Sequence, residues 1–137
     1  MFELPITVTE SDLQNDYKHV HHARSLFYLE QARLALLEAI GLSSDSYIKR
    51  GLFWVVVSIS VDYKREIKGR DIIVTCENAL VQEKVLVLDQ RIFNERGKLA
   101  VEGTVHLMLL SQETGRSTPI PQEFEKAIAR LKGKAPK

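Results

Sequence analysis

A polar segment rich in Asp, Asn and His runs directly into a helical apolar pattern between residues 11 and 33. Asn15 can orient a water molecule or donate a hydrogen bond to a carbonyl oxygen, and Asp16 can accept a proton from water. His19 and His22 lie where the helix is expected to begin. Because the first turn of a helix has unpaired N–H groups, this junction is suited to bind an incoming oxygen atom.

Two short motifs occupy this junction and the helix after it: His19-Val20-His21-His22-Ala23-Arg24-Ser25-Leu26 and Tyr28-Leu29-Glu30-Gln31-Ala32-Arg33. They resemble Asp-x-x-Gly-His-Val-Asn-Asn-Ala-x-Tyr-Leu and Tyr-Leu-Glu-x-Ala-Arg of hotdog-fold thioesterases of the 4-hydroxybenzoyl-CoA thioesterase type. The resemblance implies one hotdog domain over residues 1–137. It also implies hydrolysis of an acyl thioester of coenzyme A or of an acyl-carrier protein to the free acid and the thiol. No cofactor is implied beyond the coenzyme A of the substrate.

The catalytic carboxylate of that family lies five positions before the Val of its motif, and Asn15 occupies this position here. An amide does not ionise, so it cannot act as the general base. We therefore expect Asp16 to supply the base, with Glu30 as the second candidate. Asn15 and His19 are expected to position the water and the carbonyl, and His22 to hydrogen-bond the substrate.

Each of these side chains also has a structural interpretation. Asp and Asn are common turn residues that cap backbone N–H groups, and His22 can cap the first turn of the helix. Glu30 and Arg33 are neighbours on the helix, where Arg33 either holds Glu30 in a cleft or joins it in a partly buried ion pair. Asn15 in place of the family's acid leaves open a non-catalytic acyl-CoA-binding or scaffolding protein. A hotdog hydratase or dehydratase is less favoured, because the loop lacks its Asp-x-Asn-Pro-x-His motif.

Four basic residues crowd the end of a predicted strand and the turn that follows it: Lys64, Arg65, Lys68 and Arg70. Arg and Lys bind phosphate well, so we expect some of these residues to hold the phosphates of coenzyme A. The acidic residues between them are also typical of a solvated surface. The three histidines of the loop predict no metal site, because they lack a Cys or carboxylate partner at a familiar zinc spacing.

The composition narrows the class of protein. A chain of 137 residues with 45% apolar and 27% charged residues is typical of one globular domain. The net charge of +1 selects neither nucleic acid nor a membrane, and no apolar run is long enough to span a bilayer. The single cysteine, Cys76, and the lack of a signal-peptide pattern favour the cytoplasm. The expected partners are a small-molecule acyl thioester or an acyl-carrier protein, and further copies in a homodimer or homotetramer.

The elements that must position these residues follow from hydrophobic period and turn residues. A strand is predicted over Phe2–Thr9, and a long helix over His22–Ile40 ends at Gly41. A short helix capped by Ser43 or Ser44, four strands and a final helix are predicted over about residues 44–50, 53–64, 72–80, 85–93, 99–109 and 121–131. Short connections make these four strands antiparallel. The pattern predicts an α+β fold, and the resemblance adds that the sheet wraps around the long helix, which we expect to be largely covered.

Overall fold

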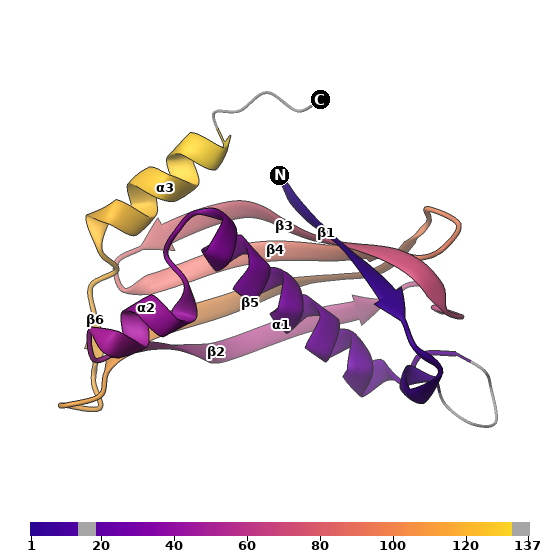
Figure 1. Cartoon of the computed structure of the whole chain (residues 1–137), viewed down its shortest axis with the longest axis horizontal. Coiled ribbons are helices and arrows are strands. Elements are labelled where there is room, and N and C mark those ends of the chain that lie inside the picture. The colour runs from indigo at the N-terminus through magenta and orange to yellow at the C-terminus, as the bar shows by residue number, and fades with distance from the viewer. Residues whose placement is uncertain (14–18, 133–137) are drawn as a thin grey trace.

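The computed structural model describes residues 1–13 and 19–132, with side chains to residue 130. One long helix lies across one face of a twisted antiparallel sheet (Figure 1). The elements, in chain order, are β1 (Phe2–Val8), a 3₁₀ turn η1 (Glu10–Asp12), α1 (His22–Ala39), α2 (Ser44–Lys49), β2 (Leu52–Tyr63), β3 (Arg70–Gln82), β4 (Val85–Phe93), β5 (Leu99–Ser111), β6 (Ser117–Thr118) and α3 (Gln122–Lys132).

The five long strands lie in the order β1-β3-β4-β5-β2, and all neighbours are antiparallel. The predicted strands, both predicted helices after α1 and the antiparallel α+β architecture are confirmed, and the arrangement is the hotdog fold. Only η1 and the two-residue β6, which pairs with the end of β5, were not predicted, because such short elements carry no periodic signal.

The helix α1 begins at His22, as predicted, and ends at Ala39, one residue before the predicted end. His21 is the N-cap and its Nδ1 accepts a hydrogen bond from the backbone N–H of Ala23 at 3.1 Å. Gly41, with φ of 77°, follows the last turn. The side of α1 that faces the sheet is buried in the core and contributes Tyr28, Leu29, Ala32, Leu36 and Leu37.

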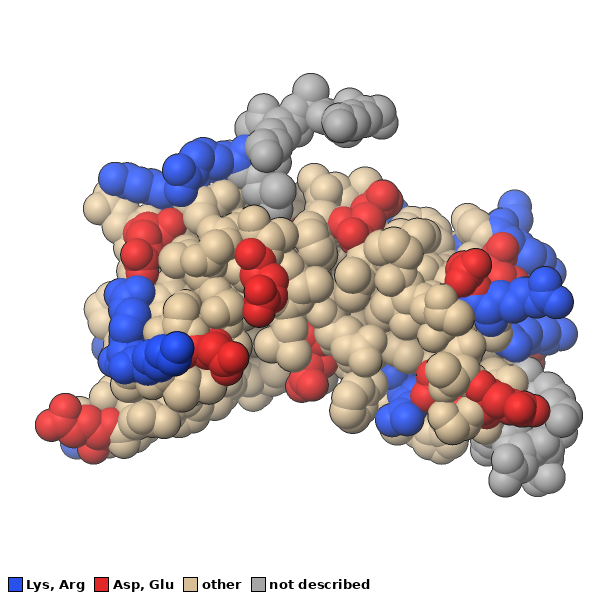
Figure 2. Space-filling view, in the orientation of Figure 1, with Lys and Arg blue, Asp and Glu red and all other residues tan. Residues whose placement is uncertain are grey.

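The opposite side of α1 is open to solvent. Leu26, Phe27 and Leu34 are 37%, 52% and 44% exposed. Within one chain the helix is therefore covered on one side only, because a single sheet reaches only that side. Figure 2 shows the same surface as mostly uncharged, with Lys and Arg gathered at the two ends of the molecule.

Bulges interrupt the alternation of side chains in β2 and β3. In β2, Trp54 and Val56 face the α1 side, and after a shift in register beyond Val56 this side is taken by Ile59. In β3, Asn78 has φ of 52°, and Leu80 beyond it is exposed although it shares the parity of the buried residues before the bulge. A regular two-residue alternation therefore does not run through either strand, because one extra residue exchanges the two faces.

The strand β5 approaches the edge strand β2 closely at Gly103. A Cβ atom built on Gly103 of β5 would lie 2.5 Å from the backbone oxygen of Ser60 in β2. Glycine therefore permits the close approach of β2 and β5 here. At the far end of α1, α3 closes the core with Phe124, whose side chain is fully buried beside Trp54. None of the helices in the described ranges is long and apolar enough to cross a membrane.

Candidate active site

The first cavity lies where the N-terminus of α1 meets the C-terminal end of β2. Its volume is about 350 Å³, and its lining includes His19, His22, Ser25, Tyr63, Lys64 and Arg65. The Tyr63 hydroxyl donates to the backbone oxygen of His22 at 2.9 Å, and the two rings meet edge to face with centroids 6.2 Å apart. The strand end therefore fixes the first residue of the helix at the cavity wall.

The cap of α1 leaves one backbone donor available at this cavity. His21 accepts from Ala23 N–H through its side chain and from Arg24 N–H through its backbone oxygen at 2.9 Å. The His21 N–H itself donates to the backbone oxygen of Asp12 at 3.3 Å. Among the described residues, nothing accepts from the N–H of His22, which lies at the positive end of the helix dipole. This group can stabilise an oxygen that gains negative charge.

The carboxylate of Asp12 fastens the segment before α1 to the helix. One oxygen accepts from Arg24 Nε at 2.6 Å, and the other accepts from the Tyr28 hydroxyl at 2.7 Å and from Thr9 N–H at 3.3 Å. A bridge between Leu13 and Val20 closes the two ends of the loop between them. Arg24 and Tyr28 are four residues apart, so both point to the same side of α1. The contacts position the histidines at the first cavity.

These contacts shift the pKa values of Asp12 and Tyr28. Burial by itself would raise the pKa of Asp12, but hydrogen bonds from Tyr28, Arg24 and Thr9 outweigh it and hold this pKa below its ordinary value. Burial and the negative charge of Asp12 raise the pKa of the Tyr28 hydroxyl. The pair therefore stays as a carboxylate and a neutral phenol near neutral pH.

The second cavity lies between α1 and the strands β2, β4 and β5, with α3 at its end. Its volume is about 130 Å³ and its walls are mainly Leu, Val, Trp and Phe side chains. Glu30 and Arg33 line it from α1, Glu30 on the exposed side of the helix and Arg33 partly buried. At roughly 1.5 Å of rise per residue, Glu30 lies about 12 Å along the helix from His22. An apolar recess of this kind suits an acyl group.

The structure separates the residues that the sequence predicted as one site. His19, His22, Lys64 and Arg65 line the first cavity, whereas Glu30 lines the second. Lys68 lines neither cavity, and its ammonium group lies 3.8 Å from Glu66. Arg70, in left-handed backbone conformation at the start of β3, also lies outside both. The predicted roles of Asn15 and Asp16 fall outside the described residues.

Two side chains that hold the start of α1 were not predicted from the sequence. The contact between Tyr63 and His22 spans 41 positions of sequence. For Asp12 a signal exists, because the four-residue spacing of Arg24 and Tyr28 places two donors on one side of the helix. No sequence signal could join β2 to the first turn of α1 before the topology was known.

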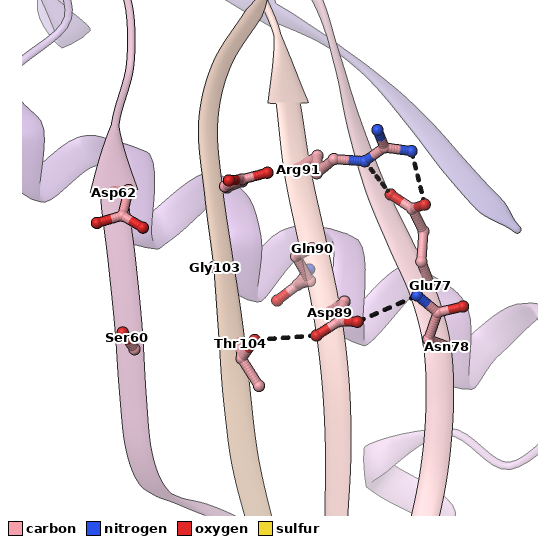
Figure 3. A pocket seen from close by; sticks show the side chains of 10 residues that line it. Ser60, Asp62, Glu77, Asn78, Asp89, Gln90, Arg91, Gly103 and Thr104 are labelled. Carbon is pink, nitrogen blue, oxygen red and sulfur yellow. Dashed lines mark hydrogen bonds and ion pairs between the residues drawn. The ribbon is translucent and has the colours of Figure 1, made fainter.

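A third hollow, of about 510 Å³, lies on the face of the sheet that points away from α1 (Figure 3). Two of its carboxylates, Glu77 and Asp89, already accept hydrogen bonds from neighbouring side chains. Glu77 accepts from Arg91 at 2.6 and 2.7 Å, and Asp89 accepts from Thr104 at 2.9 Å and from Asn78 at 3.1 Å. Within the described ranges, no three His, Cys, Asp or Glu side chains are grouped so that they could hold a metal ion. We therefore place the candidate active site at the first two cavities.

Comparisons with known proteins agree on the fold. The family model of the thioesterase-like superfamily matches residues 8–128. A DHNA-CoA thioesterase from Staphylococcus aureus is 21% identical, with a TM-score of 0.85 over 95% of this chain and 89% of that one. A 1,4-dihydroxy-2-naphthoyl-CoA thioesterase from Synechocystis is 20% identical, with a TM-score of 0.87 over 97% and 98%. A Staphylococcus aureus protein solved in complex with CoA is 23% identical, with a TM-score of 0.88 over 99% and 86%. No curated protein matches the chain.

We predict that the Asp12 contacts stabilise the protein only while the carboxylate is charged. The variant Asp12→Asn should lower the free energy of unfolding at pH 7 by about 1.5–3 kcal/mol, the usual range for hydrogen bonds to a charged group. Because the folded pKa of Asp12 lies below its ordinary value of 3.8, this contribution is present above that value and is lost as pH falls through the folded pKa. The measurement is urea unfolding of both proteins at pH 7 and at pH 3.

The matched control is Asp62→Asn, because Asp62 is exposed and forms no ion pair within the described residues. Its effect should stay within about 0.5 kcal/mol at both pH values. A difference between wild type and Asp12→Asn that is the same at pH 7 and pH 3 would contradict the assignment.

Proposed function

We propose a division of the reaction between the two cavities, from the premise that this chain belongs to the thioesterase-like superfamily and hydrolyses acyl thioesters. The thioester carbonyl accepts a hydrogen bond from the N–H of His22, and the acyl group enters the cavity lined by Glu30 and Arg33. The observation that carries the proposal is a cavity that contains Lys64, Arg65 and the first turn of α1, where no described residue accepts from the N–H of His22. The helix N-terminus can stabilise a carbonyl oxygen that becomes an oxyanion, and the two basic residues can bind the phosphates of the thiol carrier.

The reaction then requires a base and a water molecule. The base takes a proton from water as the water oxygen attacks the carbonyl carbon. The carbon–sulfur bond breaks when the tetrahedral intermediate collapses, and the departing thiolate takes the proton back from the base. Asp16 is our first candidate for the base and Glu30 the second, with Asn15 and His19 positioning the water and the carbonyl. We place the reaction in the cytoplasm, where a lone buried thiol such as Cys76 stays reduced.

We further propose that the active form is a homodimer built through β2. This strand is an edge of the sheet, and it exposes Val56, Val57, Ile59 and Tyr63. An unpaired apolar edge strand is a template for another strand, and the exposed apolar side of α1 continues the same surface. Antiparallel pairing of β2 with its copy about a two-fold axis would cover both features.

This symmetry would complete the site. Tyr63, at one end of β2, belongs to the first cavity, and Trp54, at the other end, belongs to the second. An axis near the middle of the strand sets the Tyr63 end of one copy beside the Trp54 end of the other. The helix N-terminus of one subunit then faces Glu30 of its partner, which removes the separation of about 12 Å within one chain.

The first test is hydrolysis itself, followed as free thiol released from a panel of acyl-CoAs and acyl-carrier thioesters. Asp16→Asn and Glu30→Gln keep the shape of each side chain and remove its charge. The variant that removes the base should lose about 10²–10⁴-fold in kcat, with folding unchanged by circular dichroism. Wild-type turnover in both variants would show that neither residue is the base, and a panel without any hydrolysis would contradict the proposed function.

The second test asks whether the site is shared. In His22→Gly the helix start is altered, and in Glu30→Gln the partner's carboxylate is lost, so each homodimer should be impaired. After unfolding and refolding of an equal mixture, about half of the dimers are hybrids, and each hybrid has one intact site. Activity should recover to about one quarter of wild type. Recovery to no more than the mean of the two variants would place both residues in the same subunit's site, as would a monomer in light scattering.

The third test separates the basic residues by cavity. The double variant Lys64→Gln/Arg65→Gln should raise KM for acyl-CoA and weaken product inhibition by CoA, because two phosphate contacts at the cavity are lost. We expect about 10-fold or more, shrinking as salt is added. The matched control is Lys68→Gln/Arg70→Gln, which removes the same charge outside the cavity and should change KM by less than about 2-fold. Equal effects of the two double variants would favour a diffuse field over a binding site.

A further inference from the structure

The second cavity contains a cation, Arg33, that forms no ion pair with a carboxylate of the described residues. Arg33 is partly buried between α1 and β4 and lines a cavity that is otherwise mainly apolar. Within residues 1–13 and 19–132, its only hydrogen bond runs from Nη1 to Gln90 Oε1 at 3.0 Å, and no carboxylate forms an ion pair with it. A neutral amide thus satisfies one of five guanidinium donors.

The side chain of Gln90 is held by hydrogen bonds other than the one from Arg33. Gln90 is fully buried, and its Nε2 donates to the backbone oxygen of Leu29 at 3.0 Å and to that of Thr75 at 3.3 Å. These bonds already join α1, β3 and β4. Arg33 therefore adds one bond to a network that is held together without it, and its other donors have no acceptor among the described residues.

The surroundings do not cancel the charge of Arg33. Burial lowers the pKa of its guanidinium, and Glu30 and Cys76 offset this only in part. Glu30 lies one turn earlier on the exposed side of the helix, where solvent screens it. Cys76 is a thiol whose pKa burial raises to about 12, so it is neutral near pH 7. A partly buried cation of this kind binds a carboxylate strongly and in a defined geometry.

We infer that Arg33 is a specificity-determining residue that binds an anionic group at the far end of the acyl chain, so that the preferred substrates are thioesters of dicarboxylic acids. The inference rests on the proposed function, because it takes the second cavity as the acyl site. The size of the cavity limits the chain. A cavity of about 150 Å³ holds one benzene ring, so the 130 Å³ here suits a chain of about six carbons or a single ring.

The test compares adipoyl-CoA with hexanoyl-CoA, which have the same number of carbons and differ in the terminal carboxylate. Wild type should have a kcat/KM about 10- to 100-fold higher for adipoyl-CoA, as expected for a charge-assisted, partly desolvated pair. In Arg33→Gln this ratio should fall to about 1 or below, and Arg33→Lys, which keeps the charge without the fork, should retain part of it. Because the readout is a ratio, a general loss of folded protein cancels.

The matched control is Arg24→Gln, which removes another arginine of α1. The guanidinium of Arg24 pairs with Asp12 and lies outside the second cavity. Total activity is expected to fall in this variant, but the ratio between the two substrates should not change. A wild-type ratio near 1, or a ratio that survives in Arg33→Gln, would overturn the inference while leaving thioester hydrolysis intact.

Binding without turnover separates the two proposals. S-(5-carboxypentyl)-CoA and S-hexyl-CoA cannot be hydrolysed, and calorimetry should show tighter binding of the first, by a similar factor, in wild type only. If neither adipoyl-CoA nor hexanoyl-CoA is hydrolysed but this preference is present, the inference stands and the proposed reaction fails. Equal binding of the two analogues would overturn the inference whatever the enzyme hydrolyses.

Discussion

A single sheet covers α1 on one side only, and the rest of the structure depends on that constraint. The covered side buries an apolar stripe, and Gln90 supplies the polar contact across it by donating to a helix carbonyl. The uncovered side must be polar, occupied by ligand, or covered by another molecule. It is apolar at Leu26, Phe27 and Leu34, and the described residues of a single chain leave these side chains exposed.

The start of α1 is the most tightly determined point of the molecule. His21 caps the helix, Asp12 fastens the segment before it, and the end of β2 reaches it through Tyr63. Contacts from η1, from the N-cap and from the end of β2 thus fix the position of a single group, the N–H of His22. Such redundancy is what preorganised catalysis requires, because a donor that moves by an ångström loses most of its effect on the transition state.

Local signals in the sequence predicted the fold well, and non-local ones were absent. Gly41 and Gly97 mark a helix end and a hairpin through a positive φ that few other residues adopt, and Ser43 marks a helix start by capping it with its side chain, so these boundaries could be predicted. The bulge after Val56 could not, because an extra residue within a run of valines does not disturb the apolar pattern. The grouping of Lys64 with His22, and the distance of Glu30 from both, depend on how β2 meets α1 and become visible only in three dimensions.

Pro5 makes the two edges of the sheet differ in their capacity to pair with a further strand. It lies in the middle of β1, the edge opposite β2, and pairs with Ile73. Since proline has no N–H, its nitrogen is tolerated only where it points outward from the ladder. That edge is therefore a poor template for a further strand, whereas β2 remains available. A molecule with one usable edge can join only one copy of itself, and joining consumes the edge on both sides. Strand pairing through β2 alone would therefore end at two copies, and the proline in β1 would prevent the sheet from extending into a fibre.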